Sequence, residues 1–300
     1  MSRYHEQTYV GRHTRPGPVK SRSRVFKRCL LILLAVLICA YPFVEPLMLE
    51  TEVISLVCED LPDDIGQLRI VYLSDIHAGP FFSQHRVDSL VSRVNSLYAD
   101  IVLLGGDYAT DSTSAIAFFQ NLPTFNARYG VYAVMGNHDR VEPETNLTLL
   151  IAAMKSAGVT PLVNEVAPLR IGQNTIYLAG IDEYQNGHPD IPGVAAKTRR
   201  DDFVIYLTHN PNAMTESLIC TDMNGNGQWF DLVLMGHTHG GQIALLGQIL
   251  DFTHTDSRYT QGWQQINRAH ILVSRGVGTS ILPMRLFCRP QIHQITLTSD

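Results

Sequence analysis

Two histidines, His237 and His239, stand one residue apart in the segment MGHTHGG at residues 235–241. The apolar run WFDLVL precedes them and has no helical period, so we expect the pair where a buried strand ends. Neutral imidazole is the commonest protein ligand for transition metals, and glycine lets the backbone approach a ligand closely. A lone histidine at a strand end is more often a solvated or hydrogen-bonded side chain. A metal site therefore requires further ligands elsewhere in the chain.

Four other apolar runs end in residues that could supply those ligands. Open α/β sheets bind ligands beyond the carboxyl ends of their strands, so we expect such side chains to meet at one edge. Each residue alone has a simpler explanation, because Asp and Asn are common in turns and at helix caps. Five such strand ends in one chain favour a shared site. The residues are Asp75 and His77, Asp107, the trio Asn137, His138 and Asp139, and His209.

The types of these side chains narrow the choice of metal. Carboxylates, an amide and imidazoles without a thiolate suit manganese, iron, zinc or cobalt, and disfavour calcium or an all-oxygen magnesium site. The candidates are too many for one tetrahedral ion but enough for two divalent ions bridged by Asp107. Pairs of metal ions about 3.5–4 Å apart recur in phosphatases and nucleases.

The elements that must position these residues alternate along the chain. Near-continuous apolar runs are typical of strands buried on both faces, and segments with helical spacing fit between them. This alternation predicts an α/β fold of stacked sheet and helix layers. The expected strands are 68–75, 99–107, 130–139, 175–182, 202–210, 230–241, 270–278 and the segment QITLTS; the expected helices are 83–98, 112–121, 144–157 and 211–219, with a hairpin at 242–250.

Taken together, the motifs resemble the calcineurin-like metallophosphoesterase superfamily over residues 66–300. The resemblance implies a four-layer αββα sandwich of two mixed sheets and a two-metal centre, with manganese expected first. It also implies a role for each residue. Asp75, His77 and His239 would bind the first metal; Asn137, His209 and His237 the second; Asp107 would bridge them; His138 would face the phosphate and assist the leaving oxygen; and Asp139 would orient His138.

The N-terminal part differs in composition from the rest. Residues 1–28 hold eight Lys or Arg and one Glu, a charge of +7, so the total of −5 leaves −12 for residues 29–300. We expect the basic tail to be disordered, because it has few large apolar residues. An acidic body argues against a nucleic-acid partner, which requires a basic surface.

Residues 29–49 form an apolar segment with no charge from Cys29 to Val44. Its length is at the short end for a membrane span, and we expect an uncleaved anchor in the cell (inner) membrane, because no signal-peptide cleavage site is evident. The positive-inside rule places the tail in the cytoplasm and residues 50–300 on the far side. If the segment only dips into the bilayer, the body stays cytoplasmic. Residues 50–65 are expected to be a linker or a first strand, followed by the catalytic domain at 66–300.

The string GHTHGGQ, the anchor and the closing segment SRGVGTSILPMRLFCRPQI are similar to a membrane-associated bacterial subgroup of this superfamily. It includes a UDP-2,3-diacylglucosamine pyrophosphatase, which implies hydrolysis to lipid X and UMP in lipid A biosynthesis. Gly276, Gly278, Thr279 and Ser280 could form an anion-binding nest, and Arg285 or Arg289 could reach a phosphate.

Other functions remain open at this stage. No long amphipathic cap is evident in residues 140–201, so acyl chains would rest in the bilayer or on exposed faces such as Phe81–Phe82. One alternative is an extracytoplasmic phosphodiesterase or phosphatase that acts on a non-nucleotide lipid or envelope phosphoester. A remote alternative is an inactive scaffold with the same fold, which the complete ligand set argues against.

Overall fold

The computed structural model describes residues 11, 22–141, 144–245, 248, 249, 253 and 255–299. The chain divides into two compact units, residues 1–41 and 42–300. Most of helix α1 (Arg22–Val44) lies in the first unit, and the stretch Arg24–Leu47 is long and apolar enough to cross a membrane by length and composition.

The limits of this helix correct two expected boundaries. The helix begins at Arg22, so residues 22–28 of the expected disordered tail are helical, while most of residues 1–21 lie outside the described part. Arg and Lys have good helix propensity, which lets the helix extend into the basic segment. It ends at Val44 instead of residue 49, and a short 3-10 helix over Glu45–Leu47 follows it directly, with Pro46 in its first turn.

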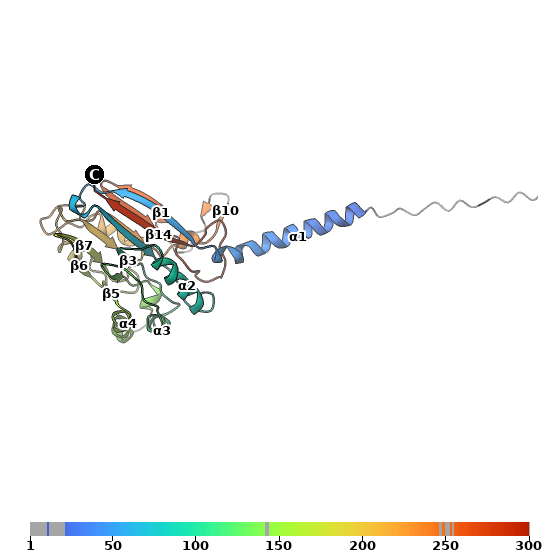
Figure 1. Cartoon of the computed structure of the whole chain (residues 1–300), viewed down its shortest axis with the longest axis horizontal. Coiled ribbons are helices and arrows are strands. Elements are labelled where there is room, and N and C mark those ends of the chain that lie inside the picture. The colour runs from blue at the N-terminus through green and yellow to red at the C-terminus, as the bar shows by residue number, and fades with distance from the viewer. Residues whose placement is uncertain are drawn as a thin grey trace, which may run out of the picture. The chain divides into compact units, whose positions relative to one another are not determined.

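The second unit contains two six-stranded mixed sheets (Figure 1). Residues 50–57 form a strand that pairs in parallel with the last strand of the chain, so the first part of the expected linker is a strand. In the first sheet the order is β1 (Glu50–Val57), β14 (Gln291–Thr298), β2 (Gln67–Leu73), β3 (Ile101–Leu104), β4 (Val131–Ala133) and β5 (Val159–Pro161). In the second it is β12 (Gly262–Ile266), β13 (Ala269–Val273), β9 (Leu232–Met235), β8 (Val204–Leu207), β7 (Asn174–Gly180) and β6 (Glu165–Ile171).

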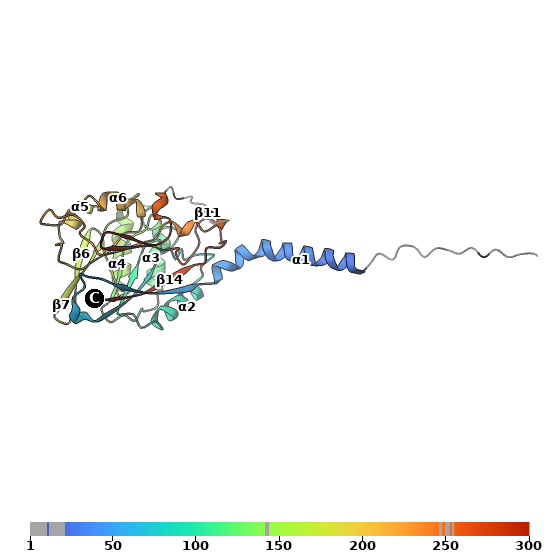
Figure 2. The same cartoon turned by 90° about the horizontal axis from the view of Figure 1, so that it is seen from above.

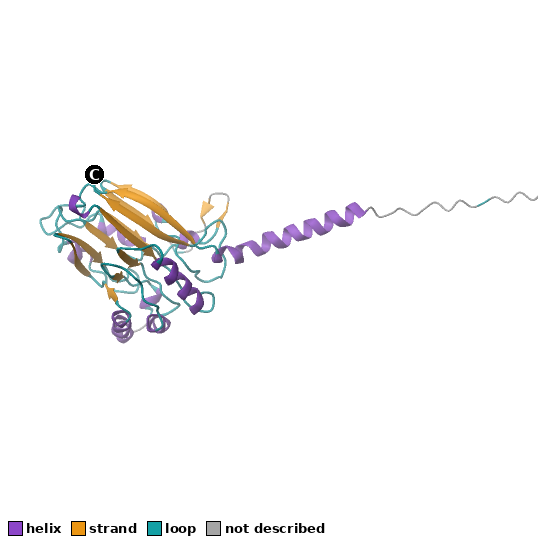
Figure 3. Ribbon diagram, viewed as in Figure 1, coloured by secondary structure: helices purple, strands orange, loops and turns teal. Residues whose placement is uncertain are grey.

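Helices cover the outer face of each sheet. Figure 3 separates helices from strands by colour, and Figure 2 shows α5 and α6 on the side of the unit away from α2. The α-helices of this unit are α2 (Gln84–Asn95), α3 (Ser112–Gln120), α4 (Glu144–Ser156), α5 (Ile191–Ala195) and α6 (Met214–Ser217). Short 3-10 helices are η1 (Glu45–Leu47), η2 (Asp63–Ile65), η3 (His138–Arg140), η4 (Pro211–Ala213), η5 (His239–Gly241) and η6 (Ser257–Tyr259). The expected hairpin is present as β10 (Ala244–Leu245) and β11 (Gln248–Ile249).

Three apolar clusters show how the layers pack. One joins the first sheet to α2, α3 and α4, a second fills the space between the sheets, and a third joins the second sheet to α5 and α6. The near-continuous apolar runs therefore form strands that are buried on both faces. The expected four-layer αββα sandwich is confirmed.

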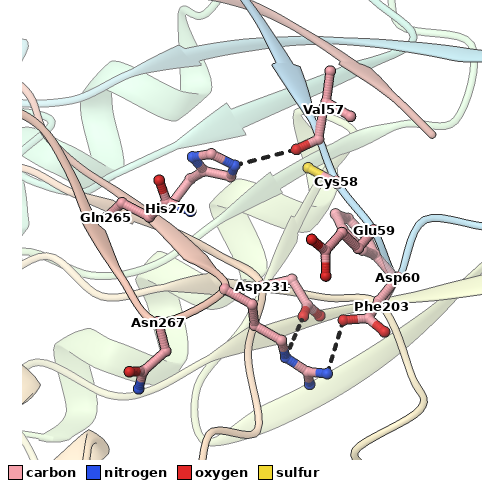
Figure 4. Close-up of a pocket in the computed structure, with 10 residues that line it drawn as sticks. Val57, Cys58, Glu59, Asp60, Phe203, Asp231, Gln265, Asn267 and His270 are labelled. Carbon is pink, nitrogen blue, oxygen red and sulfur yellow. Dashed lines mark hydrogen bonds and ion pairs between the residues drawn. The ribbon is translucent and has the colours of Figure 1, made fainter. Parts of the chain in front are cut away.

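A pocket of about 300 Å³ lies at the amino-terminal ends of β8 and β9, the edge away from the predicted ligands (Figure 4). Arg268 bridges two acids there, with distances of 2.8 Å to Asp60 and 3.3 Å to Asp231. Asp231 is almost fully buried, and burial raises its pKa to about 7 even though Arg268 opposes this. The Val204 backbone NH, which donates to Asp231 at 2.8 Å, and Arg268 both favour its charged form.

We expect Arg268→Met to destabilise the protein more at high pH than at low pH. The stability that Asp231 contributes is present at low pH and is lost as pH rises through its folded pKa, and loss of Arg268 raises that pKa further. The free energy of unfolding should fall by about 2 kcal/mol near pH 8.5 and by less near pH 5.5. Denaturant unfolding at both pH values checks this, with the exposed Arg170→Met as control. An equal loss at both pH values would contradict it.

Candidate metal centre

The predicted ligands lie together beyond the carboxyl ends of β2, β3, β4, β8 and β9. The backbone there is unusual, because several of these residues adopt left-handed φ angles that non-glycine residues rarely take. Such strain is characteristic of functional sites. The residues are Asp75 (54°), His77 (47°), Asp107 (55°), His237 (71°) and His239 (52°).

Glycines make room for the carboxylates at the same edge. A Cβ atom added to Gly136 would collide with the Asp107 carboxylate, and one added to Gly236 would collide with that of Asp75. The glycines after His239 act differently. Gly240 and Gly241 both have positive φ, and a Cβ on Gly240 would meet Arg275 and Cys288 in the loop packed behind. These two glycines therefore permit the turn of the chain and the close packing of that loop.

The three residues predicted for the first metal form a compact buried group. The Nε2 atoms of His77 and His239 are 3.0 Å apart, and His239 Nε2 lies 3.5 Å from Asp75 Oδ1. One ligand atom from each residue falls within 4.8 Å of the others.

The residues predicted for the second metal lie beside this group, with Asp107 between them. His237 Nδ1 is 2.8 Å from Asn137 Oδ1, and His209 Nε2 is 3.4 Å from Asp107 Oδ2. The same Asp107 oxygen is also 3.4 Å from His77 Nε2 in the first group. Asp107 is thus placed to contact ions in both positions.

The chemistry of these donors fits divalent metal ions. His209 Nε2 and Asp75 Oδ2 are buried without a hydrogen-bond partner among the described residues. Such atoms are costly unless something satisfies them. His209 Nδ1 faces the Gly105 carbonyl at 2.7 Å, which turns Nε2 toward the carboxylates. Cations bound between these side chains would satisfy the unpaired nitrogen and oxygen atoms.

Electrostatics supports the same conclusion. Burial lowers the pKa of His77 to about 4 and lowers that of His239 well below its ordinary value, so both rings are neutral, as ligands must be. Burial also disfavours a charged His209, but the Asp107 carboxylate outweighs it and raises the His209 pKa to about 10. The buried carboxylates therefore favour positive charge where the ions would bind.

His138 lies at the edge of this group and is half-buried. Its Nδ1 faces the Thr110 carbonyl at 3.0 Å, and its backbone NH donates to Asp107 Oδ1 at 2.9 Å. Its Nε2 has no hydrogen-bond partner among the described residues, and the ring lines a pocket of about 120 Å³ together with the metal ligands. The ring is placed to contact a substrate there.

The expected role of Asp139 is wrong. Its carboxylate accepts hydrogen bonds from the backbone NH groups of Asp107 (2.8 Å), Gly136 (2.8 Å) and Tyr108 (3.1 Å). The 3-10 turn at His138–Arg140 directs the side chain under the Asp107 loop. Asp139 holds the loop that carries Asp107, and the Thr110 carbonyl orients the His138 ring. Sequence reasoning could not find Thr110, because a backbone carbonyl has no side-chain signature.

The expected phosphate-binding arginines are also wrong. Arg285 is fully buried, and its guanidinium donates to the carbonyls of Gly278 (2.6 Å), Arg275 (2.7 Å) and Cys288 (3.0 Å). It supports the loop behind His239 and cannot reach a substrate. Arg289 pairs with Glu50 at 2.9 Å and does not line the pocket.

The expected anion nest is not free to bind an anion. The backbone NH of Gly278 donates to Asp75 O, that of Gly276 to the Ser274 hydroxyl, and that of Ser280 to Gln242 Oε1. The bond from Gly278 fixes the loop against Asp75, and the bond from Ser280 fixes it against Gln242. The apolar face expected at Phe81–Phe82 is reduced to Phe81, which is 55% exposed, because Phe82 is buried in the core.

Several pocket residues were not predicted. Gln242, Thr253 and Ile281 line the opening beside the candidate ligands, together with Ser280, which was expected only as part of the anion nest. Gln242 follows the double glycine directly, so its place next to the motif was the available signal. Asn210 follows His209 and lies 3.5 Å from His237 Nε2, the ring nitrogen on the side away from Asn137. The position of Asn210 directly after a predicted ligand was again the only indication.

Comparisons with known proteins agree with this geometry. A model of the calcineurin-like phosphoesterase family matches residues 68–241. The uncharacterized metallophosphoesterase YkuE of Bacillus subtilis is 30% identical over 263 residues, which cover 86% of this chain and 88% of YkuE. The phosphodiesterase YaeI of Escherichia coli is 30% identical over 240 residues, 78% of this chain and 84% of YaeI. A transmembrane protein with metallophosphoesterase domain from Danio rerio is 29% identical over 81% of this chain and 56% of that protein.

Proposed function

The chain belongs to the calcineurin-like phosphoesterase family, whose members are metal-dependent phosphoester hydrolases, and we propose that it is a membrane-anchored, two-metal phosphodiesterase. One observation carries the proposal: two groups of buried ligands share Asp107 and open into the pocket that His138 lines. The apolar stretch Arg24–Leu47 supports the anchor in the cell membrane.

In this proposal each residue has a defined task. Asp75, His77 and His239 would hold one ion, Asn137, His209 and His237 would hold the other, and Asp107 would contribute to both. Metal ions bound there polarise the phosphoester and make a water-derived nucleophile available at neutral pH, for which manganese is the first choice and iron, zinc or cobalt are alternatives. His138 Nδ1–H donates to the Thr110 carbonyl, and when the ring is protonated to the imidazolium, Nε2–H would pass its proton to the departing oxygen and leave the ring neutral.

The substrate is a phosphodiester or a pyrophosphate linked to a lipid. Within the described part of residues 140–201 there is no long helix to cover the pocket, because α4 packs on the core and α5 is short. An open pocket on an anchored domain suits a bulky substrate whose apolar part stays in the bilayer. UDP-2,3-diacylglucosamine, cleaved to lipid X and UMP, is one candidate. An extracytoplasmic phosphodiester of the envelope is the other.

A comparison of substrates tests the proposal. The full-length protein in detergent micelles with Mn²⁺ is incubated with UDP-2,3-diacylglucosamine and, separately, with bis(p-nitrophenyl) phosphate, and His138→Ala serves as the blank. We expect His138-dependent hydrolysis of the soluble diester. Release of UMP would assign the lipid-nucleotide substrate and a cytoplasmic domain. Diester hydrolysis without UMP release would favour the envelope substrate, and hydrolysis of neither would contradict the proposal.

A further inference from the structure

A third hollow lies in the second unit of the chain, residues 42–300, which we call the catalytic unit. We name this hollow the α2 groove, and it shares no lining residue with the pocket around His138. Its volume is about 330 Å³. Leu47 and Leu49, which follow α1 in the chain, form one side, and Phe82 contributes to the apolar wall. The other side is one face of α2. The α2 residues that matter here are Arg86, Ser89 and Arg93, spaced three and four apart so that they share a helix face.

The two arginines of the groove form no ion pair with any described residue. Arg86 donates to the carbonyls of Phe81 and Pro46, both at 2.7 Å, and its guanidinium lies 4.2 Å from the centre of the Phe82 ring. Arg93 donates to the Leu49 carbonyl at 2.8 Å and to the Thr51 hydroxyl at 3.0 Å. All of these acceptors are neutral, so both charges remain uncompensated.

Arg86 and Arg93 differ in this respect from several other arginines of the catalytic unit. Other arginines of the catalytic unit, such as Arg140, Arg268, Arg275 and Arg289, have carboxylate partners within 4.0 Å. Burial lowers the pKa of Arg86, so its charged form is less stable than that of an exposed arginine. An anion in the groove would compensate both guanidinium groups, and guanidinium binds phosphate oxygens well.

The place of the groove in the chain identifies the source of that anion. Leu47 is the last residue of the apolar stretch that could span a membrane, and it lines the groove itself. A chain advances at most about 3.6 Å per residue, so a groove beginning at Leu47 cannot lie far from the bilayer surface if the stretch is inserted. Exposed Leu47 (64%) and Phe81 (55%), whose carbonyl Arg86 holds, add apolar surface at the same place.

We propose that the α2 groove binds the phosphate headgroup of an anionic membrane lipid, with Arg86 and Arg93 on the phosphate and Leu47 and Phe81 against the acyl region. The proposal rests on the proposed membrane anchor. A bound lipid would hold the catalytic unit against the bilayer surface and so limit the positions from which the metal pocket can receive a substrate. Soluble substrates would not need this contact.

Thermal unfolding in lipid nanodiscs tests the proposal on the full chain. Wild-type protein is placed in nanodiscs of phosphatidylcholine alone or of phosphatidylcholine with phosphatidylglycerol, and the Tm of the catalytic unit is measured. We expect the anionic lipid to raise Tm by about 4 °C, and the rise to be lost in Arg86→Gln/Arg93→Gln. Because each variant is compared with itself in neutral lipid, any general destabilisation cancels.

Two variants and one added ion sharpen the result. Arg170→Gln removes one charge from an exposed position on β6 and should keep the whole rise. Arg93→Lys keeps the charge at an exposed position and should keep most of it. Inorganic phosphate added to neutral nanodiscs should have no effect. No rise in the wild type, a rise that survives in the double variant, or an equal rise with phosphate alone would each overturn the proposal.

The outcome is independent of the proposed reaction, because Tm is measured without turnover. Hydrolysis of bis(p-nitrophenyl) phosphate is followed in parallel, and the double variant should retain it. A lipid-dependent Tm in a protein without hydrolase activity would contradict the proposed function alone. Hydrolysis without a lipid-dependent Tm would contradict the lipid site alone.

Discussion

Replacing His138 by alanine is expected to lower turnover of a phosphodiester by about 10²–10⁴-fold while both metal ions remain bound. The ring is half-buried at the edge of the ligand group, its Nδ1 is held by the Thr110 carbonyl, and its Nε2 faces no partner among the described residues. The ring is therefore expected to act on the leaving oxygen, by stabilising its negative charge and by supplying a proton to it. The backbone NH that supports Asp107 is unaffected by the substitution.

The measurement combines kcat for bis(p-nitrophenyl) phosphate with metal content by mass spectrometry of the purified protein. His188→Ala is the matched control, because His188 is exposed and only its backbone NH contacts Asp182. The control should match the wild type in both readouts. Loss of a metal ion together with activity in His138→Ala would show that the ring is a ligand instead of an acid.

The core strands of the fold were predictable because a strand that is buried on both faces has a continuous apolar run in its own sequence. β3, β8 and β9 are buried along their whole length and β2 is buried from Ile70 onward, so their sequences contain continuous apolar runs that cannot be confused with loops. Strand β12 escaped prediction. It lies at the edge of its sheet and is partly exposed along its length, so the sequence GWQQI has neither an apolar run nor a clear alternation. Helix α5 has only five residues, too few for a helical period.

The strand ends that carry the candidate ligands were predictable from the same apolar runs. The strands belong to two stacked sheets, with β2, β3 and β4 in one and β8 and β9 in the other, so the stacking of the sheets brings the candidate ligands together. The errors concern side chains whose surroundings are set by distant parts of the chain. Arg285 resembles a surface arginine in sequence, but its guanidinium is buried because it donates to carbonyls of its own loop. The buried carboxylate of Glu45 accepts hydrogen bonds from the backbone NH groups of Phe287 and Cys288 and so holds that loop in place. Asp139 adjoins His138 in sequence, yet the 3-10 turn that contains both residues directs their side chains to different places.

Replacing Asp107 by asparagine is expected to have the largest effect on metal binding. One Asp107 oxygen lies 3.4 Å from both His77 Nε2 and His209 Nε2, so this carboxylate is placed between the two proposed ion positions. An asparagine amide keeps the shape of the carboxylate but loses its negative charge, and the NH₂ group cannot bind a cation. We expect metal affinity to fall by about 100-fold or more at both positions, and turnover to fall with it.

Competition with a metal-binding dye, followed by metal analysis, measures this loss directly and does not depend on catalysis. Asp201→Asn changes the same charge at an exposed position and should leave two ions bound. Asp75→Asn sharpens the comparison, because Asp75 lies 3.5 Å from His239 Nε2 and should weaken the first ion more than the second. Loss of only one ion in Asp107→Asn would show that the residue does not bridge. Equal loss in Asp75→Asn would show that the two ions bind as one cooperative unit around these carboxylates.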